Sequence, residues 1–508
     1  MSTVLPVPGS EQELAAFARL QARLPALFER VFADPLAPRA VVIVPGLSMD
    51  PDVLATVVGG LHYEERQLAM LMLLRLPNTR IVFVSSTPLE PAIVDYYLGL
   101  LPGIPLEASR PRLALLSASD ASPLTLTQKV LDRPRLLERI RQAMGDPEDA
   151  HLSCFNVTPR ERTLAVRLGI PLYGCDPGLL QYGGKSGSRR IFREAGVPLP
   201  DGVEGLAGVP GLAESLAALK SEKPGLMRAV VKLNDGFSGE GNAVFSFAGC
   251  PAERVRHWVE AHLPLNLAFE ARDMRWDLYT AKLAAMGGIV EEWIAGAGVR
   301  SPSVQLRITP VGGLEVISTH DQILGGPSGQ VFQACTFPAD PAYAREIQRL
   351  ALRVGRVLLA KGALGRFGVD FVSVPGDDGW RHAAIEINLR KGGTTHTFQM
   401  LQFLTQGHYD AARAEFVTPD GGTRSYYATD NVVNPLYRRL TPEDLVEVTD
   451  RHDLHFDAQE NRGVVFTLIG ALSEFGKIGV VAIDRDRASA LALFRSTVQV
   501  LDAAAAQD

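Results

Sequence analysis

Three pairs of short apolar runs in the middle of the chain constrain its fold most strongly. The two runs of each pair are separated by a short loop rich in glycine or by a Pro-Gly turn. The pairs are RAVVKLN with NAVFSFA (228–234 and 242–248), VQLRITP with GLEVIST (304–310 and 313–319), and GVDFVSV with RHAAIEIN (368–374 and 381–388). Runs joined in this way are typical of β-hairpins, so the middle of the chain is expected to form antiparallel sheets. Helices are expected at 188–196 and at about 341–361.

The first part of the chain shows a different pattern, in which apolar strand-like runs alternate with helix-like segments. One helical stretch runs to about Leu76 and another covers residues 134–144. The strand-like runs lie at 39–48, 80–86, 112–118 and 151–157. Alternation of strands and helices predicts a doubly wound, mostly parallel sheet. We expect an α/β domain over residues 1–178.

A third block follows the polar, glycine-rich segment at 417–425. It contains apolar runs at 463–471 and 477–484, and then a helix-like stretch from Ala488 to about Val500 with a frayed end. We expect a small α+β domain over residues 412–508. The predicted fold class is therefore a multidomain chain with α/β and α+β parts.

Composition excludes several classes of partner. The 508 residues include 51 Lys and Arg against 57 Asp and Glu, and a formal net charge of −6 does not favour nucleic-acid binding. The four cysteines form no C-x-x-C pair, which is typical of a reducing compartment. No apolar run reaches the roughly 18 residues that span a bilayer, and no signal-peptide pattern opens the chain. We expect a cytoplasmic protein without a membrane partner.

Two nucleotide-binding motifs are incomplete. Gly-Lys-Ser at 184–186 would end a P-loop, but Leu179 stands where that motif needs glycine. The glycine-rich stretch at 234–242 leads from strand to strand, whereas a dinucleotide fingerprint leads from strand to helix. A glycine loop between antiparallel strands can instead cover phosphates with backbone N–H groups. Lys232, two residues before this loop, is either a phosphate-binding cation or an ordinary solvated lysine.

A stronger candidate site lies in AAIEINLRKGG (383–393). Strand alternation places Glu386 and Asn388 on one face, and oxygen ligands two residues apart suit magnesium. Asp370 lies in the apolar partner strand, where a carboxylate is costly to bury unless it is paired or binds a metal. These three residues predict either a magnesium site or an exposed polar face. Arg390 follows at once, and a cation there suits a reaction that builds anionic oxygens.

Together, these features resemble the ATP-grasp superfamily of carboxylate–amine ligases. The order of the features matches: Lys185 before a short helix, Lys232 before the glycine loop at 236–241, an acidic hinge at 291–294, and Asp370 with the E-x-N strand. More narrowly, the chain resembles peptide ligases related to the pheganomycin-biosynthesis ligase. The matching phrases are PGLS…HYEERQL…LLRLP (45–77), STHDQILGG (318–326), EINLRKGGTTH (386–396) and TLIGALSEFGKIGVVAI (467–483).

The resemblance implies three domains. A pre-ATP-grasp α/β domain would cover residues 1–178. An ATP-grasp domain with antiparallel sheets would cover 179–411, with subdomains at about 179–290 and 291–411. A C-terminal α+β domain would cover 412–508.

The resemblance also implies a role for each motif residue. Lys185 and Lys232 would bind the phosphates of ATP, and Lys232 and Arg390 would be the catalytic cations. The loop that covers the phosphates would use Gly236, Ser238, Gly239 and Gly241. The adenine and ribose would be held by Glu291, Glu292, Trp293 and Ile294. One or two Mg²⁺ ions, replaceable by Mn²⁺, would be held by Asp370, Glu386 and Asn388.

Some polar residues keep no definite role at this stage. On the central sheet, some members of one group are expected to face the site: Gln305, Arg307, His320, Asp321 and Gln322. In the flanking domains, 62–66 (HYEER) and 95–100 (DYYLGL) are either substrate contacts or buried aromatics with surface charges. Ser473, Glu474 and Lys477 either line a substrate pocket or form a plain turn.

The activity implied by the resemblance is the joining of a carboxylate to an amine at the expense of ATP. Phosphorylation would convert the acid into an acylphosphate, the amine would displace phosphate, and ADP would be released. The family suggests an amino-acid-like acid and the amine of an amino acid or peptide, in specialised metabolism. Alternatives are a thioester-forming ligase, a small-molecule kinase and a non-catalytic nucleotide-binding module. Whether the chain forms a homodimer is left open.

Overall fold

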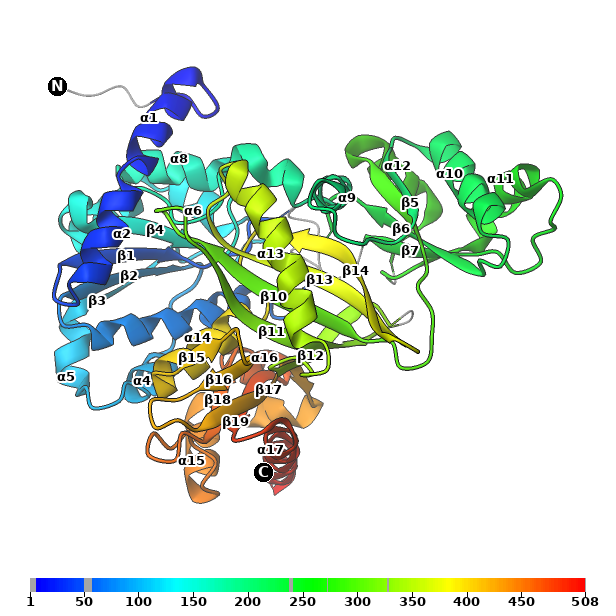
Figure 1. Ribbon diagram of the computed structural model, residues 1–508. Helices are drawn as coiled ribbons and strands as arrows, with labels where there is room; N and C mark the ends of the chain where they lie inside the picture. The colour runs from blue at the N-terminus through cyan, green and yellow to red at the C-terminus, as the bar shows by residue number, and fades with distance from the viewer. Residues whose placement is uncertain (1–5, 50–56, 237–240, 272, 327–328, 508) are drawn as a thin grey trace.

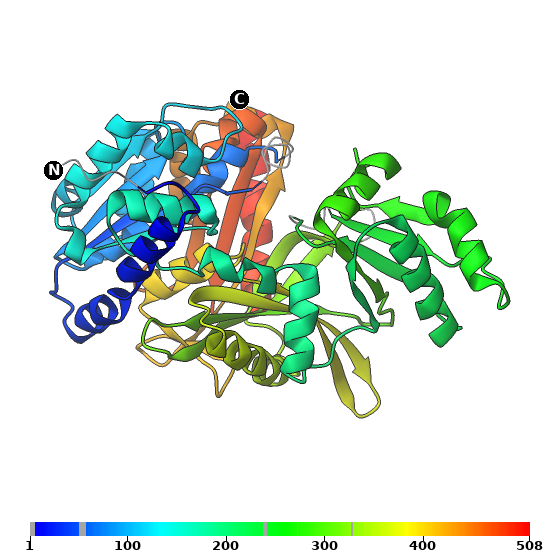
Figure 2. The same ribbon diagram turned by 90° about the horizontal axis from the view of Figure 1, so that it is seen from above.

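The computed structural model describes residues 6–49, 57–236, 241–271, 273–326 and 329–507 (Figure 1). Within these ranges the strands form three sheets, and the largest of them combines strands from the middle and the C-terminal regions of the chain. Figures 1 and 2 show that residues of the first sheet (blue) and of the C-terminal strands (orange to red) lie together in one body, whereas the described residues between 202 and 292 (green) form a separate outer lobe.

The N-terminal sheet has four parallel strands in the order β3-β2-β1-β4, which confirms the doubly wound sheet predicted for this region. Its strands are β1 (Arg39–Val44), β2 (Thr79–Ser85), β3 (Leu113–Ser117) and β4 (Ala150–Cys154). The helices around it are α1 (Glu11–Gln21), α2 (Leu24–Ala33), α4 (Pro91–Gly99), α5 (Leu106–Ser109), η2 (Arg110–Arg112), α6 (Leu126–Leu131), α7 (Pro134–Met144), η3 (Pro147–Asp149) and α8 (Pro159–Leu168). The inner strand β1 is buried because helices cover both faces of a parallel sheet.

The helical stretch predicted up to about Leu76 is a 3₁₀ helix in its described part, η1 (Gly60–Arg75). All of its residues from 63 to 72 are buried, including four polar ones. Buried polar groups need partners, and Glu64 accepts hydrogen bonds from the backbone N and the Oγ of Ser86 at 2.7 Å each. Side-chain bonds of this kind and the burial of its apolar residues from 68 to 74 in the shared core hold η1 in place.

The outer lobe is an antiparallel sheet in the order β5-β9-β6-β7-β8 with helices packed on it. Its strands are β5 (Gly202–Leu206), β6 (Arg228–Leu233), β7 (Asn242–Ser246), β8 (Leu267–Phe269) and β9 (Gly288–Glu292). Its helices are α10 (Val209–Glu222), α11 (Val255–Asn266) and α12 (Trp276–Met286). The predicted hairpin of 228–234 with 242–248 is therefore confirmed as β6 and β7.

The central sheet contains ten of the described strands, all paired antiparallel, and it includes the other two predicted hairpins. The main path runs β14-β13-β10-β11-β12-β17-β16-β15, and β19 pairs with both β17 and β18. The strands are β10 (Ser301–Ile308), β11 (Leu314–Gly325), β12 (Val331–Phe337), β13 (Gly365–Gly376), β14 (Gly379–Asn388), β15 (His408–Asp410), β16 (Glu415–Val417), β17 (Thr423–Val433), β18 (Gly463–Thr467) and β19 (Lys477–Asp484). The helices that accompany it are η4 (Pro177–Tyr182), α9 (Lys185–Glu194), α13 (Ala344–Ala360), α14 (Thr395–Thr405), η5 (Pro435–Arg439), α15 (Pro442–Arg451), α16 (Ala471–Phe475) and α17 (Arg487–Gln507).

Two expectations for the C-terminal block are wrong. The apolar run at 463–471 is a strand only to Thr467, and α16 begins at Ala471, so Ser473 and Glu474 lie on a short helix rather than in a turn. The last helix does not fray after Val500. It continues to Gln507 because Leu501 and Ala505 are fully buried against the core.

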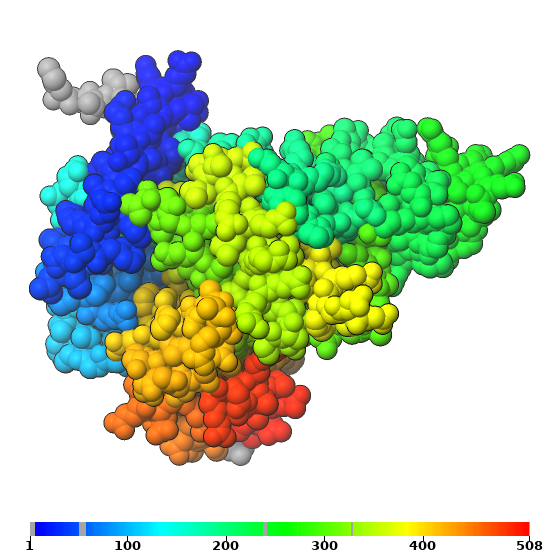
Figure 3. Space-filling view, viewed as in Figure 1, coloured from blue at the N-terminus to red at the C-terminus, as the bar shows by residue number. Residues whose placement is uncertain are grey.

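The apolar cores show how the regions join. One core contains Val41 of β1, Tyr97 of α4 and Val480 of β19, so the N-terminal and C-terminal regions bury side chains against each other. The Oη of Tyr97 also donates a hydrogen bond to the carbonyl of Phe466, at 3.1 Å. The outer lobe has a core of its own, around Leu216, and projects from the body in Figure 3. Across the described residues, none of the helices combines the length and apolarity that crossing a membrane requires.

Candidate active site

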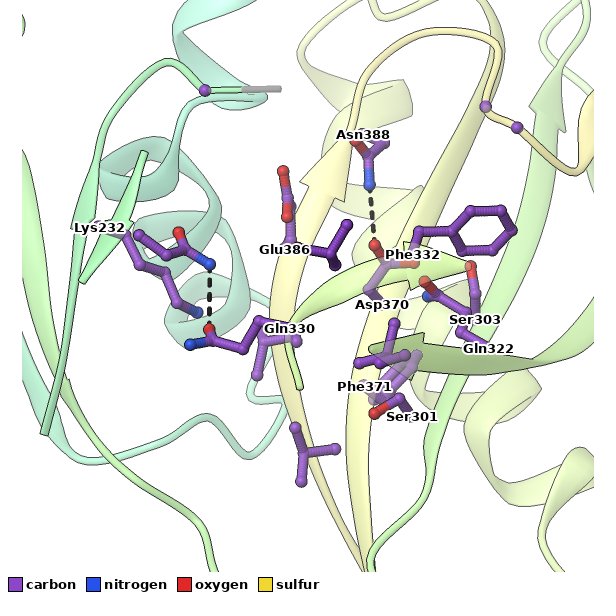
Figure 4. A pocket seen from close by; sticks show the side chains of 18 of the residues that line it. Lys232, Ser301, Ser303, Gln322, Gln330, Phe332, Asp370, Phe371, Glu386 and Asn388 are labelled. Atoms are coloured by element: carbon purple, nitrogen blue, oxygen red, sulfur yellow. Dashed lines mark hydrogen bonds between the residues drawn. The ribbon is translucent and has the colours of Figure 1, made fainter. Parts of the chain in front are cut away.

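A cleft of about 430 Å³ lies between the outer lobe and the central sheet. Figure 4 shows Lys232 reaching in from the lobe, opposite Asp370, Glu386 and Asn388 on two neighbouring strands. Asn242 of the lobe donates a hydrogen bond to Gln330 across the opening, at 3.0 Å. The hairpin geometry of both sheets therefore brings the cationic and acidic candidates of the sequence to one cavity.

The acidic group depends on the register of β13 and β14. Asp370 pairs with Glu386 and Gly368 with Asn388, and a bulge follows Asp370. The Nδ2 of Asn388 donates to Oδ2 of Asp370 at 2.9 Å. Glu386 forms an ion pair with Lys185. The three oxygen-bearing side chains thus lie together at one end of a hairpin, as alternation along the strand predicts.

The two carboxyl groups respond differently to burial. Burial and the neighbouring Glu386 carboxylate raise the pKa of Asp370 to about 6. Burial also acts to raise the pKa of Glu386, but the nearby cations Lys185, Lys232 and Arg390 outweigh it, so the pKa of Glu386 is lowered. Near neutral pH both groups are ionised, which is the state that a divalent cation requires of its ligands.

Lys185 is the first residue of α9, and Asn234 fixes this end of the helix. The backbone N of Lys185 donates to the carbonyl of Asn234 at 3.1 Å, and the backbone N and Oγ of Ser186 donate to its Oδ1 at 3.0 and 2.6 Å. Asn234 directly follows β6, the strand that contains Lys232. The same short connection therefore positions both lysines of the proposed phosphate site.

Glu291 links Lys232 to the interior of the lobe. Its Oε2 accepts from Lys232 Nζ at 2.7 Å, and its Oε1 accepts from Arg189 Nη1 at 2.6 Å. The side chain is 1% exposed, so this carboxylate is held between two cations at the cleft wall. Its contacts in this structure are thus with cations, whereas the resemblance assigns it to the ribose end of ATP.

The other hinge residues also line the cleft. Glu292 pairs with Lys223 and accepts a hydrogen bond from the backbone N of Asp201 at 3.0 Å. The backbone N of Trp293 donates to the carbonyl of Arg228 at 3.1 Å, and the Arg228 guanidinium lies 4.5 Å from the centre of the Trp293 ring. Ile294 follows as the apolar member of this wall.

The glycine loop is described only at its two ends. Gly236 lines the cleft, and the carbonyl of Gly241 accepts a hydrogen bond from the backbone N of Leu233 at 3.0 Å. Ser238 and Gly239, proposed to cover phosphates, lie outside the described residues.

The five unassigned polar residues of the central sheet divide into two groups. Gln305 and Gln322 line the cleft. The other three point elsewhere: Arg307 pairs with Glu315, His320 Nε2 contacts the Oη of Tyr426 at 2.6 Å, and Asp321 accepts from Tyr343 Oη at 2.5 Å and from Arg487 Nη2 at 2.7 Å. Alternation along β11 separates Gln322 from Asp321, which the sequence did not resolve.

Sequence reasoning missed one acidic residue of the cleft and did not assign a role to one arginine that also lines it. Asp430 of β17 lines the cleft, although part of this strand is predicted to be loop. A weak signal was present, because Asp430 stands in the strand-like run YYATDNVV (426–433), in which Tyr, Ala and Val predominate. Arg66 lies within the undecided segment 62–66, and it also lines the cleft.

Comparison with known proteins identifies the family. An L-propargylglycine–L-glutamate ligase from Streptantibioticus cattleyicolor is 30% identical over 429 residues, which cover 83% of this chain and 85% of the relative. Residues 179–259 and 252–412 match the family model described as IQCH-like ATP-grasp, and 444–497 match the PGM1 C-terminal domain. The chain belongs to the ATP-grasp ligases. The expectation of an ATP-grasp carboxylate–amine ligase is confirmed.

Other relatives of this ATP-grasp ligase extend the comparison. IQ motif-containing protein H of Danio rerio is 25% identical over 433 residues, and the match spans 76% of this chain but only 41% of that longer protein. The ADP complex of purK, an N5-carboxyaminoimidazole ribonucleotide synthetase, has a TM-score of 0.51 at 13% identity and covers 92% of this chain and 98% of its own. The biotin carboxylase domain of the Hydrogenobacter thermophilus 2-oxoglutarate carboxylase has a TM-score of 0.54 at 11% identity, with coverage of 90% and 89%. These likenesses confirm the predicted ATP-grasp fold.

Proposed function

We propose that this ATP-grasp ligase joins the carboxylate of an amino-acid-like acid to the amine of an amino acid or peptide, with ATP and Mg²⁺. The observation that carries the proposal is the single cleft in which Asp370, Glu386 and Asn388 face the cations Lys185, Lys232 and Arg390. The amino-acid substrates are supported by the name of the Streptantibioticus relative, which joins two amino acids.

The donor set fits magnesium. Among the described residues no three His, Cys, Asp or Glu side chains gather closely enough to form a metal site by themselves. The set here is two carboxylates and an amide, and magnesium is commonly held by one or two carboxylates together with substrate phosphates and water. Asp370, Glu386 and Asn388 would hold the ion, which neutralises charge on the phosphoryl group when bound.

The three cations of the cleft would act in the same reaction. Lys185 and Lys232 would bind the phosphate oxygens, since both side chains line the cleft, where Lys185 pairs with Glu386 and Lys232 with Glu291. Arg390 is half-buried near Glu386 and Asp370, and desolvation lowers its pKa without removing its charge. It would stabilise the oxyanion that forms when the amine attacks the acyl carbon. No nucleophilic side chain is needed, because phosphate is the leaving group.

A phosphate-release assay tests this function. The enzyme is incubated with Mg-ATP and pairwise combinations of the 20 protein L-amino acids and short peptides, and products are identified by mass spectrometry. We expect ADP, phosphate and an amide in equal amounts, only when an acid and an amine are both present. AMP with pyrophosphate would contradict the acylphosphate route. A stable phosphorylated product without an amine, or a thioester with an added thiol, would indicate the alternative ATP-grasp reactions.

A further inference from the structure

One wall of the cleft comes from outside the outer lobe and the β13–β14 hairpin. It consists of Tyr63 and Arg66 of η1, Phe155 after β4, and Asp430 and Asn431 of β17. These residues are far apart in the sequence, and the ion pair between Arg66 Nη2 and Asp430 Oδ2, at 2.5 Å, joins them. The wall exists only because the N-terminal and C-terminal regions share a core. We call it the η1 wall.

Arg66 packs against Tyr63 at this wall and keeps unused hydrogen-bonding capacity. Its guanidinium carbon lies 3.9 Å from the centre of the Tyr63 ring, and the Oη of Tyr63 accepts from Lys477 Nζ at 3.0 Å. The side chain is 7% exposed, and its Nε–H has no hydrogen-bond partner among the described residues. A buried N–H without a partner is costly, so this geometry favours an added acceptor.

Asp430 pairs with Arg66 and also contacts other polar groups. Asp430 also accepts from the Oγ1 of Thr467 at 3.1 Å and lies 3.6 Å from His396 Nε2. Burial acts to raise the pKa of Asp430, but Arg66 and His396 outweigh it and hold the pKa well below its usual range. The Asp430 carboxylate is therefore shared by Arg66, Thr467 and His396. It orients the Arg66 guanidinium but does not accept hydrogen bonds from all of its N–H groups.

Arg390 adds a second, half-buried cation to the same region. Its Nη1 donates to the carbonyl of Lys391 at 3.0 Å, and within the described ranges no carboxylate lies at ion-pair distance from it. Arg66 is near enough to contribute to the lowered pKa of Arg390. Both cations line the cleft, so an anion bound between them would be attracted to both.

We propose that Arg66 binds the α-carboxylate of the amine substrate, which is therefore an α-amino acid. The inference rests on the proposed function, because the other carboxylate, which is activated, belongs beside Arg390 and the acidic group. A planar guanidinium matches a carboxylate with two parallel hydrogen bonds. Binding at Arg66 fixes the amine two bonds away, facing the acyl carbon. The amine nitrogen forms the new C–N bond, the C–O bond to phosphate breaks, and one amine proton leaves to solvent.

The decisive test removes the carboxylate from the substrate. Each L-amino acid that serves as the amine in the assay above is compared with its α-carboxamide, such as L-alanine with L-alaninamide. A charge-assisted pair contributes about 1.5–3 kcal/mol, so we expect the wild-type enzyme to use the carboxamide about 10- to 150-fold less efficiently in kcat/KM. Equal use of both amines would overturn the proposal and leave the ligase function intact.

Variants of the wall identify the residue responsible. We expect Arg66→Gln to raise KM for the amino acid by about 10- to 150-fold. It should change kcat/KM for the carboxamide and KM for ATP by less than about threefold. Arg66→Lys keeps the charge without the planar fork, and should lie between the two. The matched control is Arg75→Gln on the same helix, where the guanidinium donates to the carbonyl of Phe403 away from the cleft.

The remaining outcomes are also decisive. An equal loss for the amino acid and the carboxamide in Arg66→Gln would show a structural role and overturn the subsite. If Arg66→Gln does not fold, the wild-type comparison and Arg66→Lys still decide the question. Wild-type enzyme that forms ADP with no acid–amine pair would contradict the proposed function itself, and the subsite with it.

Discussion

Glu386 is the residue on which the charge arrangement of the cleft depends. It contacts Lys185, lies opposite Asp370 in the strand register, and is near Lys232 and Arg390. Together with Asp370, this carboxylate offsets two of the three positive charges around it. In the proposed function, Glu386 would exchange Lys185 for the metal ion with no change in its own ionisation.

We expect Glu386→Gln to lower the rate of ADP formation by about 10³-fold or more, because a lost ligand weakens stabilisation of the phosphoryl group by several kcal/mol. The folded state should persist, since the amide keeps the shape of the side chain. Glu315→Gln is the control, because that carboxylate pairs with Arg307 outside the cleft and should leave the rate within about twofold of wild type. Near-normal turnover of Glu386→Gln would show that the acidic group has another function.

His62 predicts a pH dependence of stability. Its two ring nitrogens lie 2.9 Å from Glu65 and 2.9 Å from Glu474, which joins η1 to α16. Burial lowers the pKa of His62, but the two carboxylates outweigh it and raise the pKa to about 8. Because the folded pKa lies above the ordinary value of 6.5, the contribution is complete below pH 6.5 and is lost as the pH rises through 8. It amounts to at most about 2 kcal/mol.

Urea unfolding between pH 6 and pH 9 measures this contribution. Part of the fall in unfolding free energy over that range should disappear in His62→Gln. His257→Gln, exposed on α11, should keep the wild-type profile. A profile for His62→Gln that parallels wild type would show that the His62 ion pairs do not contribute.

At the scale of elements, α9 depends on a glycine at its third position. A Cβ on Gly187 would lie 1.8 Å from the backbone oxygen of Gln181, so α9 and η4 pack too closely for any side chain there. Gly211 holds the same third position in α10, yet a Cβ added there meets nothing within 4 Å. The two glycines make a matched pair, one required by packing and the other tolerated.

We expect Gly187→Ala to lower the free energy of unfolding by about 1–3 kcal/mol and to raise KM for ATP, because Lys185 begins the displaced helix. Gly211→Ala should instead stabilise the protein by about 0.5–1 kcal/mol, since alanine favours a helix over glycine. Denaturation midpoints and ATP kinetics check both variants. A stabilising Gly187→Ala would mean that α9 and η4 can separate without cost.

At the scale of the whole molecule, the chain folds around cores that do not all follow sequence order. Side chains from β1, α4, β17 and β19 share one core, while the outer lobe keeps its own. Residue ranges for three domains remain a prediction. The shared core nevertheless implies that the N-terminal and C-terminal regions unfold together, and that the outer lobe can open separately.

Two leucines, both fully buried, test this coupling. Leu472→Ala, in the shared core, should lower stability by about 2–5 kcal/mol and speed amide exchange in β1 as well as in β19. Leu216→Ala, in the core of the outer lobe, should speed exchange in that lobe alone. Hydrogen exchange followed by mass spectrometry resolves the two regions. If the Leu472→Ala substitution leaves amide exchange in β1 unchanged, the N-terminal and C-terminal regions unfold independently.

Local pattern was enough for the hairpins and for the acidic group. Glycine or Pro-Gly loops set β6–β7 and β13–β14, and strand alternation placed Glu386 and Asn388 on one face, because side-chain direction in a strand has a period of two. The order of lysines, glycine loop and E-x-N strand was also sufficient to suggest the ATP-grasp family. These features depend on residues close in sequence, where a pattern alone constrains geometry.

Tertiary structure alone decided the η1 wall. Arg66 and Asp430 are separated by 364 positions, and no local pattern can say that they meet. It also decided that Gln322 lines the cleft while Asp321 contacts Tyr343 and Arg487 instead. The sequence by itself determined the three central hairpins and predicted the residues proposed to bind ATP and Mg²⁺. Only the shared core of the two ends of the chain decided that Arg66 and Asp430 line the same cleft, because burial can join any two segments whatever their separation.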